Sequence, residues 1–297
     1  MRKTAAILLF LSLLASFVLA NPCQAVELRY NFTSGSNYNY GLWLNGDMKI
    51  FVKSSGQREP LSAKLNGYAD ITQSIDKAID SNTATITTVF DNIQGKISFI
   101  GIGQEISLPA DMVKKFQEII NPVTVEIDRR GKILSISMPS LDKFLQAMAK
   151  QERLLPPNPL AETNKRLADA PSPLPEGDIP PGHTWNSISK VVLPDGKTVE
   201  ITVHNTFKGI TEVDGKSCYI IENTMSLPLE AFLPASVKAT KDMRLNGSIS
   251  AKTLTHHEAS NMMIMHTDAS LDIKMNMGIS DTMVNIDAVI KVLLNRR

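Results

Sequence analysis

Residues 284–294, Val-Asn-Ile-Asp-Ala-Val-Ile-Lys-Val-Leu-Leu, decide the fold class. Apolar side chains fill every second position, and most of the residues between them are polar. Because successive side chains of a strand point to opposite faces, this period of two predicts a β-strand buried on one face. The apolar face would carry Val284, Ile286, Ala288, Ile290, Val292 and Leu294.

Turn signals elsewhere in the chain predict hairpins. Asp214-Gly215 lies between strand-like stretches at 198–213 and 217–227, and Asp-Gly is a strong hairpin signal because the turn needs positive φ. Residues 248–277 are expected to form three strands with short turns. The other predicted turns are 80–82 (between strands at 67–79 and 83–93), 129–131 (within a hairpin at 123–136), 45–47 and 194–196.

Helical spacing is confined to a few stretches. Apolar residues recur at helical spacing in 110–120, between Pro109 and Asn121-Pro122, which are suitable boundaries. A second helix is expected at 140–155 with Ser140 as its N-cap, and a short one near 229–239. The helices are expected to pack on a sheet through their apolar stripes.

Eight of the sixteen prolines lie between residues 156 and 181, which excludes a central strand and predicts an extended linker. The stretches on either side look alike: Gly35 to Tyr40 and Gly182 to Trp185 each precede a strand and a long hairpin. We therefore predict a mainly β (α+β) fold, with antiparallel curved sheets in two related halves and a few packed helices. The predicted divisions are 1–25 (signal peptide), 26–155 (first repeat), 156–181 (linker) and 182–297 (second repeat).

The N-terminus has the pattern of a secretory signal peptide: Arg2 and Lys3, then an uncharged apolar run from Ala5 to Ala20. Cleavage after Ala25 is preferred and cleavage after Ala20 is the alternative; an uncleaved anchor is disfavoured by the length of the run. The first cut removes Cys23 and leaves Cys218 as the only thiol, whereas the second permits a Cys23–Cys218 disulfide. The expected location is periplasmic or extracellular in a bacterium, with no transmembrane segment in the mature chain.

Composition and motifs limit the function classes. Without Arg2 and Lys3, the 31 basic residues become 29, against 30 acidic residues, so a nucleic-acid partner is not expected. Nucleophile elbows, phosphate-binding loops and the zinc-protease motif are missing from the sequence. We therefore expect a protein that is not an enzyme and that needs no cofactor.

Two groups of side chains are candidate sites. His256, His257 and His266 lie among methionines, a ligand set that suits copper, but adjacent strand residues point to opposite faces, which favours a packing role. Aromatic residues are dense near the N-terminus and could line an apolar ligand groove or fill a core. The candidate ligand-binding residues are Tyr38, Tyr40, Trp43 and Trp185.

The chain resembles an uncharacterised family of exported bacterial proteins with two β-rich repeats. The matching motifs are short: Leu28 to Tyr40, Val125 to Leu134, Gly182 to Trp185 and Val213 to Lys216. A more distant, fold-level likeness is to lipoprotein carriers of the LolA/LolB type, based on the export signal, the long hairpins and the few helices. That likeness implies a curved sheet around helices with an apolar cavity for acyl chains.

These observations leave two main hypotheses and a third, which is an enzyme with an unrecognised site or a copper-binding protein. The first is an exported non-enzymatic binding protein for a lipid or another apolar ligand. The alternative is a structural or assembly factor of the cell envelope that binds a partner protein.

Overall fold

The computed structural model describes residues 25–53, 61–78, 82–101, 103–143, 173–192, 198–232, 243–279 and 282–297. Most of them belong to long strands. The elements are β1 (Val26–Glu27), β2 (Asn37–Lys53), β3 (Leu61–Ala78), β4 (Thr83–Ile100), β5 (Glu105–Ser107), α2 (Ala110–Ile120), β6 (Val123–Asp128), β7 (Ile133–Ser137), β8 (Asp178–Ile179), β9 (Thr184–Val192), β10 (Thr198–Val213), β11 (Lys216–Pro228), the 3-10 helix η1 (Leu229–Phe232), β12 (Met243–Glu258), β13 (Ile264–Ile279) and β14 (Thr282–Arg296).

Twelve of the strands form one antiparallel sheet, in the order β7-β6-β4-β3-β2-β14-β13-β12-β11-β10-β9, with β5 paired to β4. The last strand, β14, pairs with β2 along almost its whole length, from Met283↔Lys53 to Arg296↔Tyr40. The two parts of the chain therefore share one continuous sheet. The short strands β1 and β8 make a separate two-stranded sheet.

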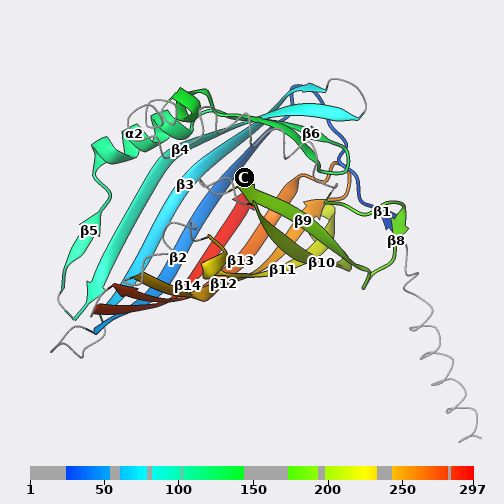
Figure 1. Ribbon diagram of the computed structural model, residues 1–297. Coiled ribbons are helices and arrows are strands. Elements are labelled where there is room, and N and C mark those ends of the chain that lie inside the picture. Colours follow the sequence, from blue (N-terminus) through cyan, green and yellow to red (C-terminus); the bar gives the residue numbers. More distant parts are fainter. Residues whose placement is uncertain are drawn as a thin grey trace, which may run out of the picture.

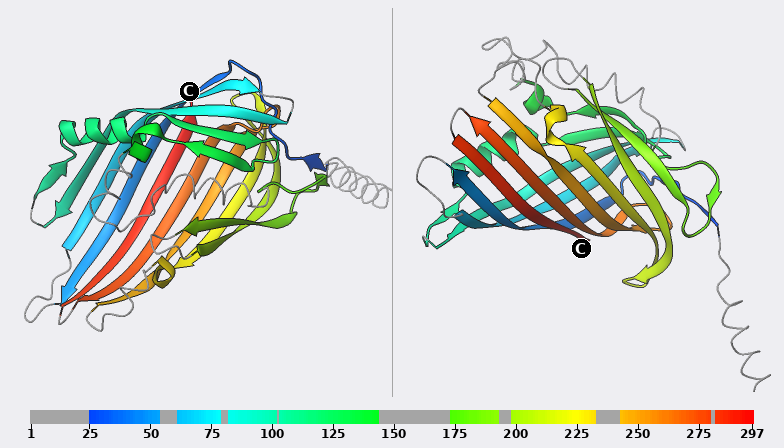
Figure 2. Two further views of the ribbon diagram at one scale, coloured as in Figure 1. Left: turned by 45° about the horizontal axis from the view of Figure 1, so that its top comes forward. Right: turned by 60° about the horizontal axis from the view of Figure 1, so that its bottom comes forward.

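The large sheet curls across its width, so that the strands at its two ends rise on the same side of β2 and β14 (Figures 1 and 2). Long strands twist, and bulges increase the twist locally. Such irregularities occur between Tyr68 and Asp70 and between Phe207 and Gly209. The result is a trough with an inner (concave) face and an outer (convex) face.

The predicted alternation of β14 is confirmed: its apolar row lies on the inner face, and the residues between lie on the outer face. Ile290 on the inner face lies opposite Gly46, and Val292 and Leu294 lie opposite Leu44 and Leu42. The residues between them are outward: Asp287, Val289 and Lys291 are exposed. The same parity continues into β13, where Leu271, Ile273, Met275 and Met277 share the inner face.

One end of the trough is closed by two buried clusters. The first contains Leu28, Leu174, Ile179, Phe207, Ile221 and Met262, and the second contains Tyr38, Tyr40, Ile75, Ala84, Ile86 and Met263. The segment that precedes β2 crosses this end, since the Tyr30 amide donates to the Arg129 carbonyl and the Asn31 amide to the Asn261 carbonyl. Leu28, which is fully buried, fastens this segment to the first cluster.

Most of the predicted elements are confirmed. The hairpins β3–β4, β6–β7 and β10–β11 and the helix α2 are present with the expected bounds or longer ones. Residues 139–143 are helical, close to the predicted start of the second helix, and η1 occupies the start of the third. Ser140 is not the N-cap as predicted but lies in the first turn, because the Asp142 amide donates to the Met138 carbonyl. The signal peptide with Cys23, the turn at 194–196 and most of the linker lie outside the described residues.

Two predictions are wrong. Residues 248–277 belong to two long strands, β12 and β13, because only one turn, at 259–263, interrupts their pairing. Asn45-Gly46-Asp47 is not a turn but the middle of β2, where Gly46 is paired on both sides. A Cβ atom on Gly46 would lie 3.3 Å from the Ile290 side chain, so the glycine serves close strand packing instead of a bend.

Within the described residues, no helix combines the length and the apolar character needed to cross a membrane.

Candidate ligand-binding site

An apolar cavity of about 490 Å³ lies on the inner face, between the sheet and α2. Its floor comes from β2, β3 and β4, and its roof comes from α2 and the segment 123–141. Tyr68 and Gln94 are the only polar residues in the lining, and the cross-strand register directs their side chains to the outer face. The lining residues are Leu42, Leu44, Gly67, Tyr68, Ala69, Phe90, Ile93, Gln94, Phe116, Ile120, Val123, Met138 and Leu141.

The cavity exists because part of one strand has no neighbouring strand on one side. β4 pairs with β6 over residues 83–88 and with β5 over residues 96–98, so the stretch between them lacks a strand partner on that side. The helix α2 lies beside this gap (Figure 1). Its apolar stripe therefore faces a space that a further strand would otherwise close.

Asn121, directly after α2, holds the helix against the edge of β4. Its side-chain amide donates to the Phe90 carbonyl at 2.6 Å, and its side-chain oxygen accepts from the Phe90 backbone N–H at 2.9 Å. Both backbone groups of Phe90 are thus satisfied by one side chain, as a neighbouring strand would satisfy them. This contact sets the distance between the helix and the strand at one end of the cavity.

The apolar surface extends beyond the cavity along the inner face. Met48, Ile50, Ile249, Ile273 and Met275 point inward and are only half-buried. The helix α2 has no buried residue, and Met112 and Phe116 are 54% and 53% exposed. Large apolar side chains that line a concave surface without being buried favour binding of a further apolar group.

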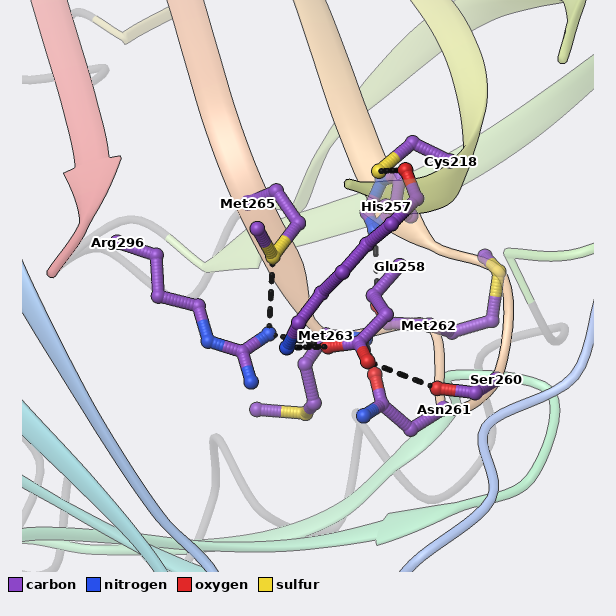
Figure 3. Close-up of polar contacts among 10 residues, drawn as sticks. Cys218, His257, Glu258, Ser260, Asn261, Met262, Met263, Met265 and Arg296 are labelled. Carbon is purple, nitrogen blue, oxygen red and sulfur yellow. Dashed lines mark hydrogen bonds and ion pairs between the residues drawn. The ribbon is translucent and has the colours of Figure 1, made fainter. Parts of the chain in front are cut away.

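Polar side chains end the apolar floor at the closed end of the trough, and Figure 3 shows the polar contacts around Arg296 and Glu258. The row that contains Leu42 and Leu294 continues to the pair Tyr40 and Arg296. Arg296 Nη1 lies 2.5 Å from Glu258 Oε2 and 3.1 Å from the Met265 sulfur. Burial raises the pKa of Tyr40, whose hydroxyl is buried and has no hydrogen-bond partner within the described residues.

The electrostatics at this end are dominated by Glu258. Burial alone would raise the pKa of its carboxyl group, but hydrogen bonds from Arg296, Ser260 and Lys216 outweigh burial and lower the pKa. The Ser260 hydroxyl donates at 3.0 Å, and Lys216 Nζ lies at 3.3 Å. Glu258 is therefore an ionised acceptor that ties the β12–β13 turn to β11 and β14.

Two further titratable groups lie near Glu258. The His257 ring and the Met262 carbonyl are 2.9 Å apart, which requires Nδ1–H as the donor. Burial lowers the pKa of His257, and burial raises the pKa of the Cys218 thiol, which is fully buried. Both groups are packed parts of the closed end.

The structure places the predicted aromatic residues in three different environments. Tyr38 and Tyr40 belong to the second buried cluster at the closed end. Trp43 lies on the outer face beside Tyr68. The Trp185 indole N–H donates to the Pro173 carbonyl at 2.6 Å, and its ring packs on the first cluster. The four residues therefore do not converge on one surface.

The predicted histidine set is divided between the two faces. His256 and His266 are cross-strand partners on the outer face, with ring centroids 5.5 Å apart. His257 lies past a register shift and faces Met262. Among the described residues, no group of three or more His, Cys, Asp or Glu side chains could hold a metal ion.

The residues that line the cavity were not predicted from the sequence, although a signal was present. From Tyr38 to Ile50, every second residue of β2 faces inward, and most of these residues are apolar. That alternation could identify Leu42 and Leu44 as inward residues. The alternation could not show that α2 leaves a space above Leu42 and Leu44. That space exists because β6 and β5 pair with separate parts of β4 and leave the stretch between them unpaired.

No protein-family model matches the chain, and no curated protein matches it. An outer membrane channel from Pseudomonas putida aligns over 90% of this chain and 97% of its own, with 5% identity and a TM-score of 0.28. A DUF1329 family protein from Desulfovibrio piger aligns over 84% of this chain and 83% of its own, with 9% identity and a TM-score of 0.15. Both TM-scores are too low to indicate a shared fold, and the resemblance to an exported family stays a prediction.

Proposed function

We propose that this protein is an exported, non-enzymatic binding protein that holds an apolar chain, such as the acyl chain of a lipid, on the inner face of its sheet. The observation that carries the proposal is the cavity between α2 and strands β2 to β4. Its volume of about 490 Å³ falls within the range of small-molecule sites, roughly 300–1,000 Å³. Its lining offers a ligand almost no hydrogen bonds.

The surroundings of the cavity support a long ligand over a compact one. The apolar floor runs on from Leu44 to Gly46, Met48 and Ile50, and the neighbouring strand adds Ala288 and Ile286 in register. At the other end, Tyr40 and Arg296 stop the apolar row. A ligand chain would lie along β2 with its end against this polar stop.

A binding assay with a fluorescent fatty acid tests the proposal. Delipidated protein is titrated with cis-parinaric acid, whose emission rises when its chain enters an apolar site. We expect saturable binding to the wild-type protein. Ala69, 6% exposed on the inner face, lines the cavity, so Ala69→Phe should fill part of it and lower the affinity at least tenfold.

The matched control is Ser270→Phe, because Ser270 faces outward in the same sheet. This variant should bind cis-parinaric acid as the wild-type protein does. A wild-type protein without saturable binding, or equal affinities for Ala69→Phe and Ser270→Phe, would contradict the proposal. Circular dichroism of each variant shows whether the strand content is retained.

A second candidate is an envelope assembly factor that binds a partner protein. It is favoured by apolar residues on the edge formed by β4, β5 and α2: Ile100, Ile106, Leu108 and Met112 are each 45–54% exposed. Reproducible capture of one envelope protein by the wild-type chain, abolished by Ile106→Asp with Leu108→Asp, would support this role. Capture of the same envelope protein by the double variant would contradict this role.

A further inference from the structure

A second cavity, of about 630 Å³, opens on the outer face of the sheet and is not used by the proposed function. Ser107, Leu108, Ala110 and Val113 border it at the edge of the sheet, and the outer-face side chains of its lining form two cross-strand rows. One row is Trp43, Tyr68 and Gln94, and the next is Asn45, Asn66 and Lys96, each taken from β2, β3 and β4 in turn. The rows place an aromatic wall beside a floor of side-chain amides.

The amides have unused hydrogen-bonding capacity. Asn45, Asn66 and Gln94 are exposed, and none of the three forms a side-chain hydrogen bond within the described residues. Each amide offers two N–H donors and one carbonyl acceptor. Three such groups on one side of a pocket can donate to and accept from the same ligand.

The aromatic wall is held in position from behind. The Trp43 and Tyr68 rings lie 5.6 Å apart, and the Arg297 guanidinium lies 5.6 Å from each ring centroid. Arg297 Nη1 in turn donates to Asp70 Oδ1 at 2.7 Å, on the side away from the amides. The rings therefore present a preorganised apolar surface to the pocket.

The pocket carries no free charge among its lining residues. Lys96 is the one charged side chain there, and its Nζ lies 2.6 Å from Glu105. This pairing disfavours a strongly anionic or cationic ligand. Asn45 and Asn66 project from β2 and β3, which are paired on both sides, so an extended peptide could not pair with a free strand edge beside these two amides.

We propose that the outer-face pocket binds a neutral oligosaccharide. A chain of pyranose rings offers apolar C–H faces that fit the Trp43–Tyr68 wall, and hydroxyl groups that both donate to and accept from the Asn45, Asn66 and Gln94 amides. Gln94 lies in the same row as the two rings, and Asn45 and Asn66 lie in the adjacent row, so one sugar ring contacts both the wall and the amides. The side chains of this site lie on the face opposite the acyl-chain site, although Gly67, Tyr68, Ile93 and Gln94 border both cavities.

The test uses the two tryptophans of the chain. In a Trp185→Phe protein, Trp43 is the only tryptophan, so its fluorescence reports on the pocket alone. This protein is titrated with the N-acetylglucosamine tetramer and with the glucose tetramer. We expect a saturable change of Trp43 fluorescence with at least one of them. Calorimetry with the wild-type chain should give the same dissociation constant. The calorimetric measurement tests the proposal even if Trp185→Phe does not fold.

Substitutions then assign the contacts. Asn45→Ala and Asn66→Ala should each weaken sugar binding by about fivefold to tenfold, as expected for one lost hydrogen bond. The control is Asn276→Ala, an exposed outer-face amide on β13. The proposal is overturned if neither tetramer binds the wild-type chain, or if Asn45→Ala and Asn66→Ala bind as Asn276→Ala does. Cis-parinaric acid binding is measured in the same variants and should be unchanged, so a failure of the sugar site can be distinguished from a failure of the acyl-chain site.

Discussion

Arg296 on β14 reaches across β13 to Glu258 at the end of β12, with 2.5 Å between Nη1 and Oε2. The two side chains are only 15% and 13% exposed, and the guanidinium also lies 4.4 Å above the Tyr38 ring. One ion pair therefore joins the C-terminal strand, the β12–β13 turn and the start of β2. This junction closes the trough at the end where the apolar floor stops.

Removing one partner of this pair should be strongly destabilising. Arg296→Met leaves the Glu258 carboxylate largely buried without its closest cation, and we expect a loss of about 3 kcal/mol in the free energy of unfolding, measured with urea. Lys216→Met is the control, since Lys216 is 43% exposed and its pair with Glu258 should contribute less than about 1 kcal/mol. Equal losses for the two variants would show that burial of the Arg296 pair has no special effect.

Asn121→Ala tests the contact that positions α2. The substitution removes both hydrogen bonds to the Phe90 backbone, and we expect it to lower the free energy of unfolding by about 2 kcal/mol. It should also weaken cis-parinaric acid binding, because α2 forms part of the cavity roof. Gln117→Ala, on the same helix, removes only an exposed contact to Asp91 and should leave both quantities nearly unchanged. If Asn121→Ala bound cis-parinaric acid as tightly as the wild-type protein, the position of α2 would not matter for ligand binding.

The stability of the protein should fall as the pH drops below about 6.5. Burial holds the pKa of His257 below its value in the unfolded chain, and the neighbouring His256 acts in the same direction, while the hydrogen bond to the Met262 carbonyl opposes them. Between the two pKa values the unfolded chain binds a proton that the folded chain does not, so acidification favours unfolding. The contribution of His257 to the free energy of unfolding is fully present above the pKa that this residue has in the unfolded chain.

His257→Gln checks this assignment, because glutamine can donate to the Met262 carbonyl but does not titrate. Urea unfolding at pH 8 gives the effect of the substitution on packing alone. Between pH 7 and pH 5 the free energy of unfolding should fall less steeply for His257→Gln than for the wild-type protein. Parallel pH curves would exclude His257 as a source of the pH dependence.

Gly247→Ala tests the close approach of β12 to β13. Gly247 has φ +148°, and a Cβ atom there would lie 2.0 Å from the Lys274 carbonyl oxygen. We expect a loss of stability above about 3 kcal/mol, seen as a large fall in melting temperature. Gly177→Ala, with φ +72° and nothing near its Cβ position, introduces backbone strain alone and should cost about 1 kcal/mol. A Gly247→Ala protein that melts like Gly177→Ala would contradict the close contact.

Several local elements were predictable because short-range physics determines them. The apolar row from Val284 to Leu294 required a strand with one buried face, and Asp214-Gly215 required a hairpin turn, which the positive φ of both residues confirms. Pro109 and Asn121 bounded α2 as expected. In each case the deciding interactions lie within a few residues of one another.

Long-range pairing overruled other local signals. Asn45-Gly46-Asp47 has the composition of a turn, but Gly46 fits between Leu65 and Ile290 of the adjacent strands, and the ladder continues through it. The placement of Trp43 and Tyr40 on opposite faces follows from their spacing, yet only the sheet shows that the outer face carries a second pocket.

The amino-acid sequence by itself determined that this chain forms long antiparallel strands with one apolar face, because alternation and turn residues act locally. Only the tertiary structure decided that β14 pairs with β2, that the sheet curls into a trough and that α2 covers the gap beside β4. These features arise from contacts between residues far apart in the chain, whose partners no local pattern specifies. The candidate sites depend on those contacts, since each is assembled from strands that meet only in the folded sheet.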